Sequence, residues 1–405
     1  YTLATHTSGT PTIVNRGLIR WTLGDVGGDL VLTASTNAAV TLPGLTTGAV
    51  NALNTIGQYA GPNVAFTTLA GTLQNLTTDE VMAAGERLRP EIHDGVMRLA
   101  LGMTDRVQGL VASRLFDAHL AAAYGLTGLA SGDAPSVGAS LWMQGFGFGG
   151  DQSRRAGVDG YTAEATGLAF GADRLVGEDG RVRLGAAFGY ARGDVNNQGA
   201  TDTSQLTLDH YLAMLYASRS EEDWYLNGML GFGRQNYRGT RIPLSGMNTI
   251  GHRDGVQLTA RMEAGMPLHY GEDLTFIPVA TVSYNRLRED RYQEIGSLVA
   301  LEVGARNTDS LRSGLGGKAI YTVQETDWRA DLELRTMWGH EFGDVRQDVT
   351  ARFLAGGPAF FSPGVNPARD EFNVGGSLRL TGANEQDEIS LLLSYDADFR
   401  ARYFG

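Results

Sequence analysis

From residue 140 to the end of the chain, large apolar residues alternate with small or charged residues. Between residues 182 and 193, the apolar side consists of Val182, Leu184, Ala186, Phe188 and Tyr190. The opposite side carries glycine, alanine and arginine, and the same split recurs at residues 256–268 and 328–339. A period of two is the signature of a β-strand with unlike faces. The chain is therefore predicted to be largely β, as a soluble sandwich or as a membrane barrel.

Composition narrows the possible functions of the chain. Its 405 residues include 55 glycines, about twice the usual share, and no cysteine, which removes disulfides, thiolate metal sites and thiol nucleophiles. The net charge is -12 without any Lys/Arg-rich run, so nucleic acid is not expected as a partner. No helical membrane span is expected, because no run of about eighteen apolar residues exists, whereas a barrel strand needs only about ten alternating residues.

The connections between the predicted strands alternate in length. Short connections lie near residues 177–180, 220–223, 271–273, 324–327 and 384–387. Longer polar connections lie near residues 152–160, 196–203, 238–251, 289–308 and 343–369. Short turns at one rim and long loops at the other favour an outer-membrane barrel over a sandwich. About eleven strands can be counted, whereas bacterial barrels have an even number, so the final strand is expected to be missing from this chain.

Aromatic residues near the strand ends are predicted to form a girdle at the membrane interfaces. This girdle comprises Trp142, Tyr190, Tyr216, Trp224 and Trp338. The alternation also places Phe146 and Phe148, in the segment GFGFGG, on the outer face of their strand. The glycines of that segment are not expected to bind a nucleotide, because no helix follows them.

Residues 91–124 have helical periodicity instead. Apolar residues such as Val96, Met103 and Val107 recur at helical spacing, but charged residues interrupt the run too often for a lipid-exposed helix. Three glycines lie at heptad spacing in this segment: Gly95, Gly102 and Gly109. Each costs up to about 1 kcal/mol relative to alanine, so a close neighbour is expected along their stripe. An amphipathic helix on a soluble core is the simpler alternative.

The residues before this helix are predicted to form two further parts. Residues 46–90 have apolar residues at helical intervals, with a break at Gly61-Pro62 and an N-cap at Thr77 or Thr78. Residues 1–45 contain short strands that are joined by a turn at Gly27-Gly28.

Several segments, taken in order, resemble a known family. LWMQGFGFGG, TGLAFGADRLVG and RVRLGAAFGYARGD open the strand-rich region, and MWGHEFGD and ISLLLSYDADF lie near its end. Their order and spacing resemble the translocator domain of the monomeric autotransporters, the type V secretion family of Gram-negative bacteria. The resemblance covers about residues 73–405. The segment GLIRWTLGDVGGDLVLTAS similarly resembles the last rungs of a β-helical passenger.

The resemblance implies an all-β fold, a twelve-stranded antiparallel transmembrane β-barrel with an α-helix threaded through its lumen. It divides the chain into the end of a passenger at residues 1–45, a helical linker at 46–90, the lumenal helix and its link at 91–138, and the barrel at 139–405. The implied function is export and surface anchoring of the chain's own passenger from the outer membrane. The implied partners are outer-membrane lipid and lipopolysaccharide, the barrel assembly machinery, periplasmic chaperones and the passenger itself.

Within this fold, inward charges are candidate contacts for the helix. The predicted helix plug comprises Gly95, Arg98, Gly102, Asp105, Arg106 and Gly109. The predicted lumen charges are Arg261, Glu263, Arg312, Lys318, Arg329, Asp331, Glu333 and Arg335. Some of them are expected to pair with charged helix residues; alternatively, they only solvate a water-filled pore.

No catalytic residue, cofactor or metal site is predicted. His340 and Glu341 lack the second histidine of a zinc protease helix and lie on a predicted strand. Residues 91–124 contain no asparagine, so passenger cleavage by asparagine cyclisation within the helix is not expected. The competing functions are a diffusion porin, an adhesin-type barrel with ligand-binding loops, and a soluble β-sandwich enzyme.

Overall fold

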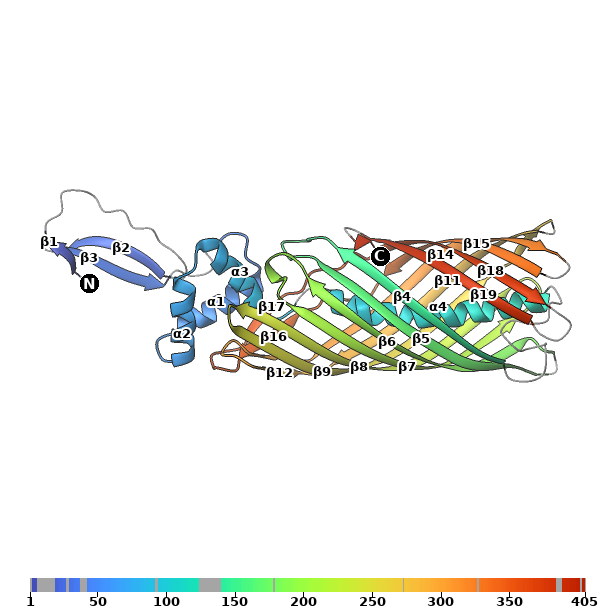
Figure 1. Ribbon diagram of the computed structural model, residues 1–405, viewed down its shortest axis with the longest axis horizontal. Helices are drawn as coiled ribbons and strands as arrows, with labels where there is room; N and C mark the ends of the chain where they lie inside the picture. The colour runs from blue at the N-terminus through green and yellow to red at the C-terminus, as the bar shows by residue number, and fades with distance from the viewer. Residues whose placement is uncertain are drawn as a thin grey trace.

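A computed structural model describes residues 2–5, 19–26, 29–36, 42–91, 94–123, 140–177, 179–271, 273–325, 328–383, 388–400 and 403–404. Three parts follow one another along the molecule: a small N-terminal sheet, a group of helices, and a barrel with a long helix inside it (Figure 1). The barrel wall is antiparallel throughout. The predicted all-β barrel fold is confirmed.

Long strands form the barrel wall, and neighbours in the wall are hydrogen-bonded. In wall order they are β4 (Ser140–Gln152), β5 (Tyr161–Val176), β6 (Val182–Asn197), β7 (Gln205–Ser220), β8 (Tyr225–Leu244), β9 (Met247–Gly265), β11 (Leu274–Glu289), β14 (Arg306–Gln324), β15 (Trp328–Glu341), β18 (Asp370–Ala383) and β19 (Glu388–Arg400). The two-residue β20 (Tyr403–Phe404) pairs with β19 on one side and β4 on the other. The described residues thus include a short strand in the twelfth position, where none was predicted.

The two faces of most wall strands follow the predicted alternation. In β6, Leu184, Phe188 and Tyr190 are exposed, whereas Ala187 and Ala191, at alternate positions, are buried. Large apolar side chains are exposed around the whole wall, among them Phe170, Leu215, Leu230, Leu258, Val282, Leu315, Leu334, Leu378 and Leu393. Such a continuous apolar outer surface is that of a barrel in lipid, whereas a soluble sandwich would bury it.

The predicted faces of β4 are reversed. Leu141 and Met143 are exposed, whereas Phe146 and Phe148 pack against buried residues of the lumenal helix. The two phenylalanine rings fill the space between the wall and that helix. The glycines that alternate with them lie on the outer face instead, so size alone does not tell which face of this strand is lipid-exposed.

The connections are short at one rim and mostly long at the other. The residues predicted as a loop at 238–251 instead extend β8 and β9, which pair as far as Leu244 and Met247. Short strands within other connections are β10 (Leu268–Tyr270), β12 (Tyr292–Ile295), β13 (Leu301–Val303), β16 (Val349–Phe353) and β17 (Phe360–Ser362). All of these except β10 lie at the rim with the long loops.

The predicted helices before the barrel are present. They are α1 (Thr47–Tyr59), α2 (Val64–Gln74) and α3 (Thr78–Leu88), and each has a capped N-terminus. Thr77 is the N-cap of α3, as the sequence indicated: its side chain accepts from the Glu80 backbone N–H, and its own N–H donates to the Glu80 carboxylate at 2.7 Å. This reciprocal capping box fixes the start of α3.

A hydrophobic core lies outside the barrel, between α1–α3 and the long loops. Leu53, Phe66 and Leu73 of the helices are fully buried in it. Four connections of the barrel contribute to the same cluster through Val158, Leu244, Val299, Leu301, Val303, Val349, Ala351, Phe353, Phe360 and Val365. We call this unit of α1–α3 and the loop strands β12, β13, β16 and β17 the outer cap.

The N-terminal sheet consists of β1 (Thr2–Thr5), β2 (Ile19–Val26) and β3 (Asp29–Thr36), in the order β1-β3-β2. The predicted strands on either side of Gly27-Gly28 are thus present as β2 and β3. Both pairings are antiparallel. The described residues of this segment thus form an antiparallel sheet, and its assignment as the end of a β-helical passenger stays a prediction.

Candidate functional site: the lumen and its outer mouth

The long helix α4 (Gly95–Ala123) lies inside the barrel (Figure 1). Its 29 residues correspond to roughly 44 Å of helix. Asp94, just before it, accepts a hydrogen bond from Tyr161 of β5 at the long-loop rim. Phe116, near its other end, packs against Tyr225 at the start of β8, near the short-turn rim. The chain therefore runs from the outer cap through the lumen to the short-turn rim, as the threaded-helix prediction required.

One side of α4 is bound by an apolar wall. The helix lies against β4–β8, where Val107 and Val111 belong to a buried cluster with Ala169, Ala187 and Leu212. A second cluster, nearer the long-loop rim, joins the helix residues Val96, Leu99, Ala100 and Met103 to Ala163, Ala165, Ala191, Val195, Leu206 and Leu208. Small residues on the wall let the helix approach closely, so apolar burial holds this side of α4.

The close approach depends on glycines of the barrel more than on those of the helix. A Cβ added at Gly189 of β6 would lie 2.7 Å from a methyl carbon of Val107. At Gly102 of the helix, an added Cβ would meet the Phe148 ring at 3.0 Å, but at Gly109 it would meet nothing within 4 Å. The expectation that one close neighbour follows the whole helix stripe is therefore wrong at Gly109. Gly95 lies at the first position of α4, where the helix has just begun.

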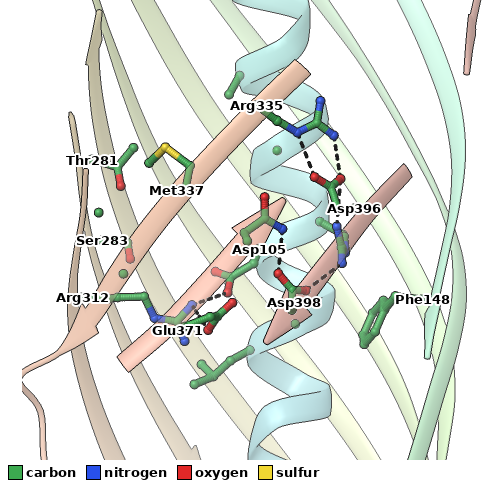
Figure 2. A pocket seen from close by; sticks show the side chains of 18 of the residues that line it. Asp105, Phe148, Thr281, Ser283, Arg312, Arg335, Met337, Glu371, Asp396 and Asp398 are labelled. Atoms are coloured by element: carbon green, nitrogen blue, oxygen red, sulfur yellow. Dashed lines mark hydrogen bonds and ion pairs between the residues drawn. The ribbon is translucent and has the colours of Figure 1, made fainter. Parts of the chain in front are cut away.

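The other side of α4 faces a polar cavity of about 660 Å³. Ionic contacts cross the lumen around this cavity (Figure 2). Asp105 pairs with Arg312 of β14 at 3.2 Å. Arg106 pairs with two carboxylates of β19, Asp396 at 3.3 Å and Asp398 at 3.1 Å. These pairs connect the helix to the strands that the apolar wall does not include.

Only part of the predicted charge pairing is present. Arg312 forms an ion pair with the helix, and the Lys318 ammonium lies over the ring of Phe116 of α4, 4.7 Å from its centroid. The other predicted lumen charges pair within the wall. Arg261 and Lys318 flank Glu263 at 3.1 and 3.7 Å, Arg329 pairs with Asp331 at 2.8 Å, and Arg335 pairs with Glu333 at 2.8 Å. Most of the predicted lumen charges thus pair with one another and not with charged residues of α4, because inward positions on the strands are closer to one another than to the helix.

Arg98, another predicted plug residue, pairs with Asp94 one turn earlier on its own segment. Arg155, from the loop between β4 and β5, also reaches Asp94 at 3.4 Å. Farther along the helix, Arg114 pairs with the buried Asp173 of β5 at 3.2 Å. The ion pairs of α4 thus occur at both rims as well as at the cavity.

The carboxylates that bind the helix are not among the predicted site residues. These are Asp173, Asp396 and Asp398. Glu371 lies beside them in the wall, 3.6 Å from Arg312. A signal for two of them was available, because Asp396 and Asp398 alternate in SYDADF with Tyr395 and Phe399, which are exposed, and therefore occupy inward positions. Strand periodicity identifies the face of a residue but not its partner across a lumen.

The predicted girdle residues lie on both faces of the wall. Tyr190, Trp224 and Trp338 are exposed. Trp142 and Tyr216 are instead on the lumen side: the Trp142 indole donates to the Tyr216 hydroxyl at 2.9 Å, and that hydroxyl donates to Asp173 at 3.0 Å. Their assignment to the girdle is wrong, because they complete the polar contacts around Arg114.

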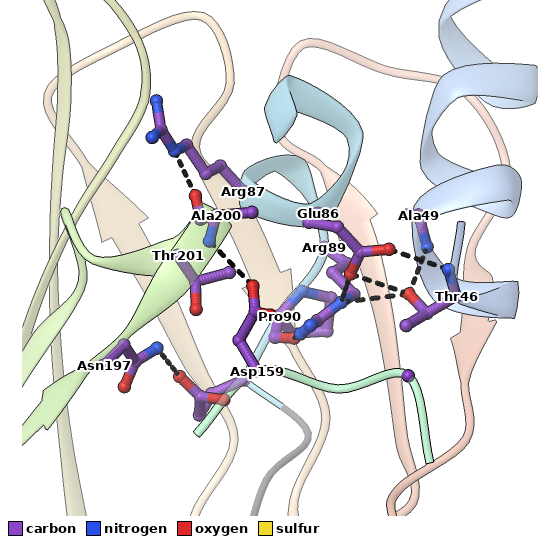
Figure 3. A network of polar contacts seen from close by, with 12 residues as sticks. Thr46, Ala49, Glu86, Arg87, Arg89, Pro90, Asp159, Asn197, Ala200 and Thr201 are labelled. Atoms are coloured by element: carbon purple, nitrogen blue, oxygen red, sulfur yellow. Dashed lines mark hydrogen bonds and ion pairs between the residues drawn. The ribbon is translucent and has the colours of Figure 1, made fainter. Parts of the chain in front are cut away.

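A network of polar contacts surrounds the chain where it leaves the barrel (Figure 3). Glu86 of α3 accepts from the Thr46 N–H at 2.7 Å and from Arg89 at 2.8 Å. Asn197, at the end of β6, donates to the Glu91 carboxylate at 2.6 Å, and Arg241 of β8 donates to the Arg87 carbonyl at 2.6 Å. We call residues 86–91 and these partners the exit junction; it joins α3 to the outer rim.

Within the described residues, no helix combines the length and apolarity needed to cross a membrane. In the same part of the chain, no group of three or more His, Asp or Glu side chains is arranged to hold a metal ion. His340 pairs with Asp370 at 2.8 Å, and Glu341 accepts from Ser310. Both belong to the polar contacts of the strand ends.

Known proteins share this architecture and part of this sequence. The family model described as "Autotransporter beta-domain" matches residues 141–396. Outer membrane protein B of Rickettsia prowazekii is 21% identical over 286 residues, which are 68% of this chain and 17% of that protein. The Escherichia coli protein YaiT is 27% identical over 185 residues, 45% of this chain and 18% of its own length. The chain thus spans less than a fifth of these curated relatives.

Among solved structures, the translocator domain of autotransporter NalP from Neisseria meningitidis is similar in fold. It has a TM-score of 0.52 and 14% identity, with 76% of this chain and 96% of that chain covered. The apolar outer wall, the helix inside it and the family match agree with one another. This chain belongs to the autotransporter β-domain family, as an outer-membrane translocator of a Gram-negative bacterium.

Proposed function

We propose that the barrel exports the passenger that precedes it in its own chain and then anchors that passenger at the cell surface. The observation that carries this proposal is the path of the chain: α4 fills part of the lumen, and the residues N-terminal to it lie beyond the long-loop rim (Figure 1). A segment in this position is what remains when a polypeptide has passed outward through the barrel that holds its other end.

The contacts of α4 support the anchoring step. Buried apolar clusters on one side and ion pairs on the other hold the helix against its wall. The occupied lumen argues against an open diffusion porin. The long loops are covered by the outer cap, which argues against an adhesin that binds ligands through free loops.

We further propose the partners that this function requires. The exposed apolar wall would contact outer-membrane lipid and lipopolysaccharide. Periplasmic chaperones and the barrel assembly machinery would act before membrane insertion, because the apolar face cannot remain in water. We expect no enzymatic activity from the translocator part of the chain.

The test uses the natural full-length protein with an epitope tag between β2 and β3. Intact cells are treated with protease and antibody, and permeabilised cells serve as the comparison. We expect the tag to be accessible on intact cells while the barrel keeps heat-modifiable gel migration. A folded barrel whose tag is accessible only after permeabilisation would overturn the proposal.

A further inference from the structure

The polar cavity beside α4 extends along most of the helix. Its lining includes helix residues from Met97 to Phe116. At about 1.5 Å per residue this corresponds to roughly 30 Å, about the thickness of the hydrocarbon core of a bilayer. Charged groups such as Lys318, Glu333 and Arg335 line the wall side. The helix alone therefore leaves a hydrated path, and a permeability barrier on this side has to lie at an end of the cavity.

One loop closes over the outer end of this path. Residues 342–369, which join β15 to β18 and contain β16 and β17, enter the barrel mouth. Val345 is buried in a cluster with Met97 and Leu101 of α4. Gln347 is buried as well, and its amide donates to Thr308 of β14 at 2.9 Å. We call residues 342–369 the lid.

The base of the lid is drawn together. Arg369, at its end, donates to the Glu341 carbonyl at 2.9 Å and to the Gly343 carbonyl at 3.2 Å. Asp348 accepts from the Gly364 N–H at 2.8 Å, which joins the two arms again. The lid is therefore a structured unit that can cover the mouth as one body.

The outer surface of the same loop is held by the cap helices. Asn51 of α1 donates to the Phe361 carbonyl at 2.8 Å, and Asn63 before α2 donates to the Ala355 carbonyl at 2.7 Å. Phe66 of α2 packs edge-on against Phe353, with 5.6 Å between ring centroids. The loop thus contacts α4 on its inner side and α1–α2 on its outer side.

We propose that residues 342–369 seal the hydrated side of the lumen and that docking of α1 and α2 holds this lid shut. This function, a barrier to ions and small solutes, goes beyond passenger export. The order of events rests on the proposed export function: the lid can be fastened only after residues 47–74 have emerged. The pore would then remain open to the polypeptide during passage and close when its last helices dock.

The test is ion conductance of the natural full-length protein in planar lipid bilayers. Phe66→Asp places a charge in the fully buried contact with the lid. Val64→Asp is the matched control, because Val64 lies on the same helix with 83% of its surface exposed. We expect a several-fold rise in conductance for F66D and the wild-type value for V64D. Heat-modifiable migration verifies that each barrel is folded.

A second variant acts on the lid directly and does not depend on the cap. Val345→Gly with Gln347→Gly removes the side chains that contact α4 and β14, and we expect conductance to rise as in F66D. Wild-type conductance in this folded double variant would overturn the lid. A rise there without a rise in F66D would overturn the role of α1 and α2. Surface display of the tagged passenger, measured in parallel, reports separately on the export function.

Discussion

The two sides of the lumen hold the same helix by different means. Along β4–β8, small apolar residues pack directly against α4. Across the cavity, β14 and β19 reach the helix through charged side chains, such as Arg312 and the carboxylates that Arg106 contacts. Near the short-turn rim, Phe116 of the helix also packs against Ile320 of β14. The lumen therefore has a fitted side, β4–β8, whose packing determines the position of the helix. It also has a hydrated side, across the cavity, which contacts the helix at a few points. Substitutions on the two sides should therefore differ in size and sign.

The largest effect is expected from a charge on the fitted side. Val111→Asp places a carboxylate at a fully buried position, so we expect a loss of about 3 kcal/mol or more from the folded helix–barrel unit. The control is Ser113→Asp, since Ser113 lines the cavity and a new charge there stays hydrated. The measurement is the temperature at which heat-modifiable migration is lost, together with protease cleavage of α4. Equal losses in the two variants would contradict the difference between the sides.

Glycine substitutions should have opposite signs on the two sides. Gly189→Ala forces a methyl group toward the stiff Val107 side chain at 2.7 Å, which we expect to destabilise by about 1–3 kcal/mol. Gly109→Ala adds a methyl where nothing lies within 4 Å, and the better helix propensity should stabilise by about 0.5–1 kcal/mol. The same thermal assay compares them. A stabilising G189A would show that the helix can move away from its wall at little cost.

Ion pairs on the hydrated side should contribute less. Asp105 and Arg312 are each about a quarter exposed, so we expect a coupling of about 0.5–1 kcal/mol in a double-mutant cycle with alanine. The comparison pair is Arg261 and Glu263, which contact each other and not the helix. Its replacement should leave protease protection of α4 unchanged. If replacing Arg261 and Glu263 exposed α4 to protease while replacing Asp105 and Arg312 did not, the pair that holds the helix would be the other one.

The smallest effect is expected in the outer cap, at the start of α3. Hydrogen bonds from the backbone and then the side chain of Thr77 hold the pKa of Glu80 below its ordinary value. Because this pKa is lowered in the folded state, the stabilisation is present above the unfolded pKa and is lost as pH falls through the folded pKa. The protection factors of the α3 amides, which are corrected for the pH dependence of intrinsic exchange, should therefore fall in acid. Glu80→Gln should remove most of that pH dependence; an unchanged profile would assign it to other groups.

The sequence allowed much of the fold to be predicted, because local signals agree with the final structure. The alternation in β6 identified its outer face, and Thr77 with Glu80 identified the start of α3. The faces of β4 could not be predicted in the same way. There Phe146 and Phe148 are large enough to suit lipid, but the space beside α4 requires them inside.

The candidate site was less predictable for a related reason. Arg312 could be recognised as inward-facing, but its contact with Asp105 depends on where the helix lies across the lumen. Arg261 has the same inward direction and pairs with its neighbour Glu263 instead. Charge and periodicity do not predict that α4 lies nearer to one side of the barrel. That position follows from the small residues of the wall on which the helix packs.

The Arg106 contacts have a consequence for the order of assembly. The helix precedes all the wall strands in the chain, whereas Asp396 and Asp398 lie on β19, about 290 residues later. Contacts with such long sequence separation form late, because a long segment must first be ordered between the partners. The fitted side of the helix could thus form with the early strands alone. Arg106 would then meet its carboxylates only when the wall is nearly complete. Formation of this contact would therefore depend on correct placement of β19, the last long strand.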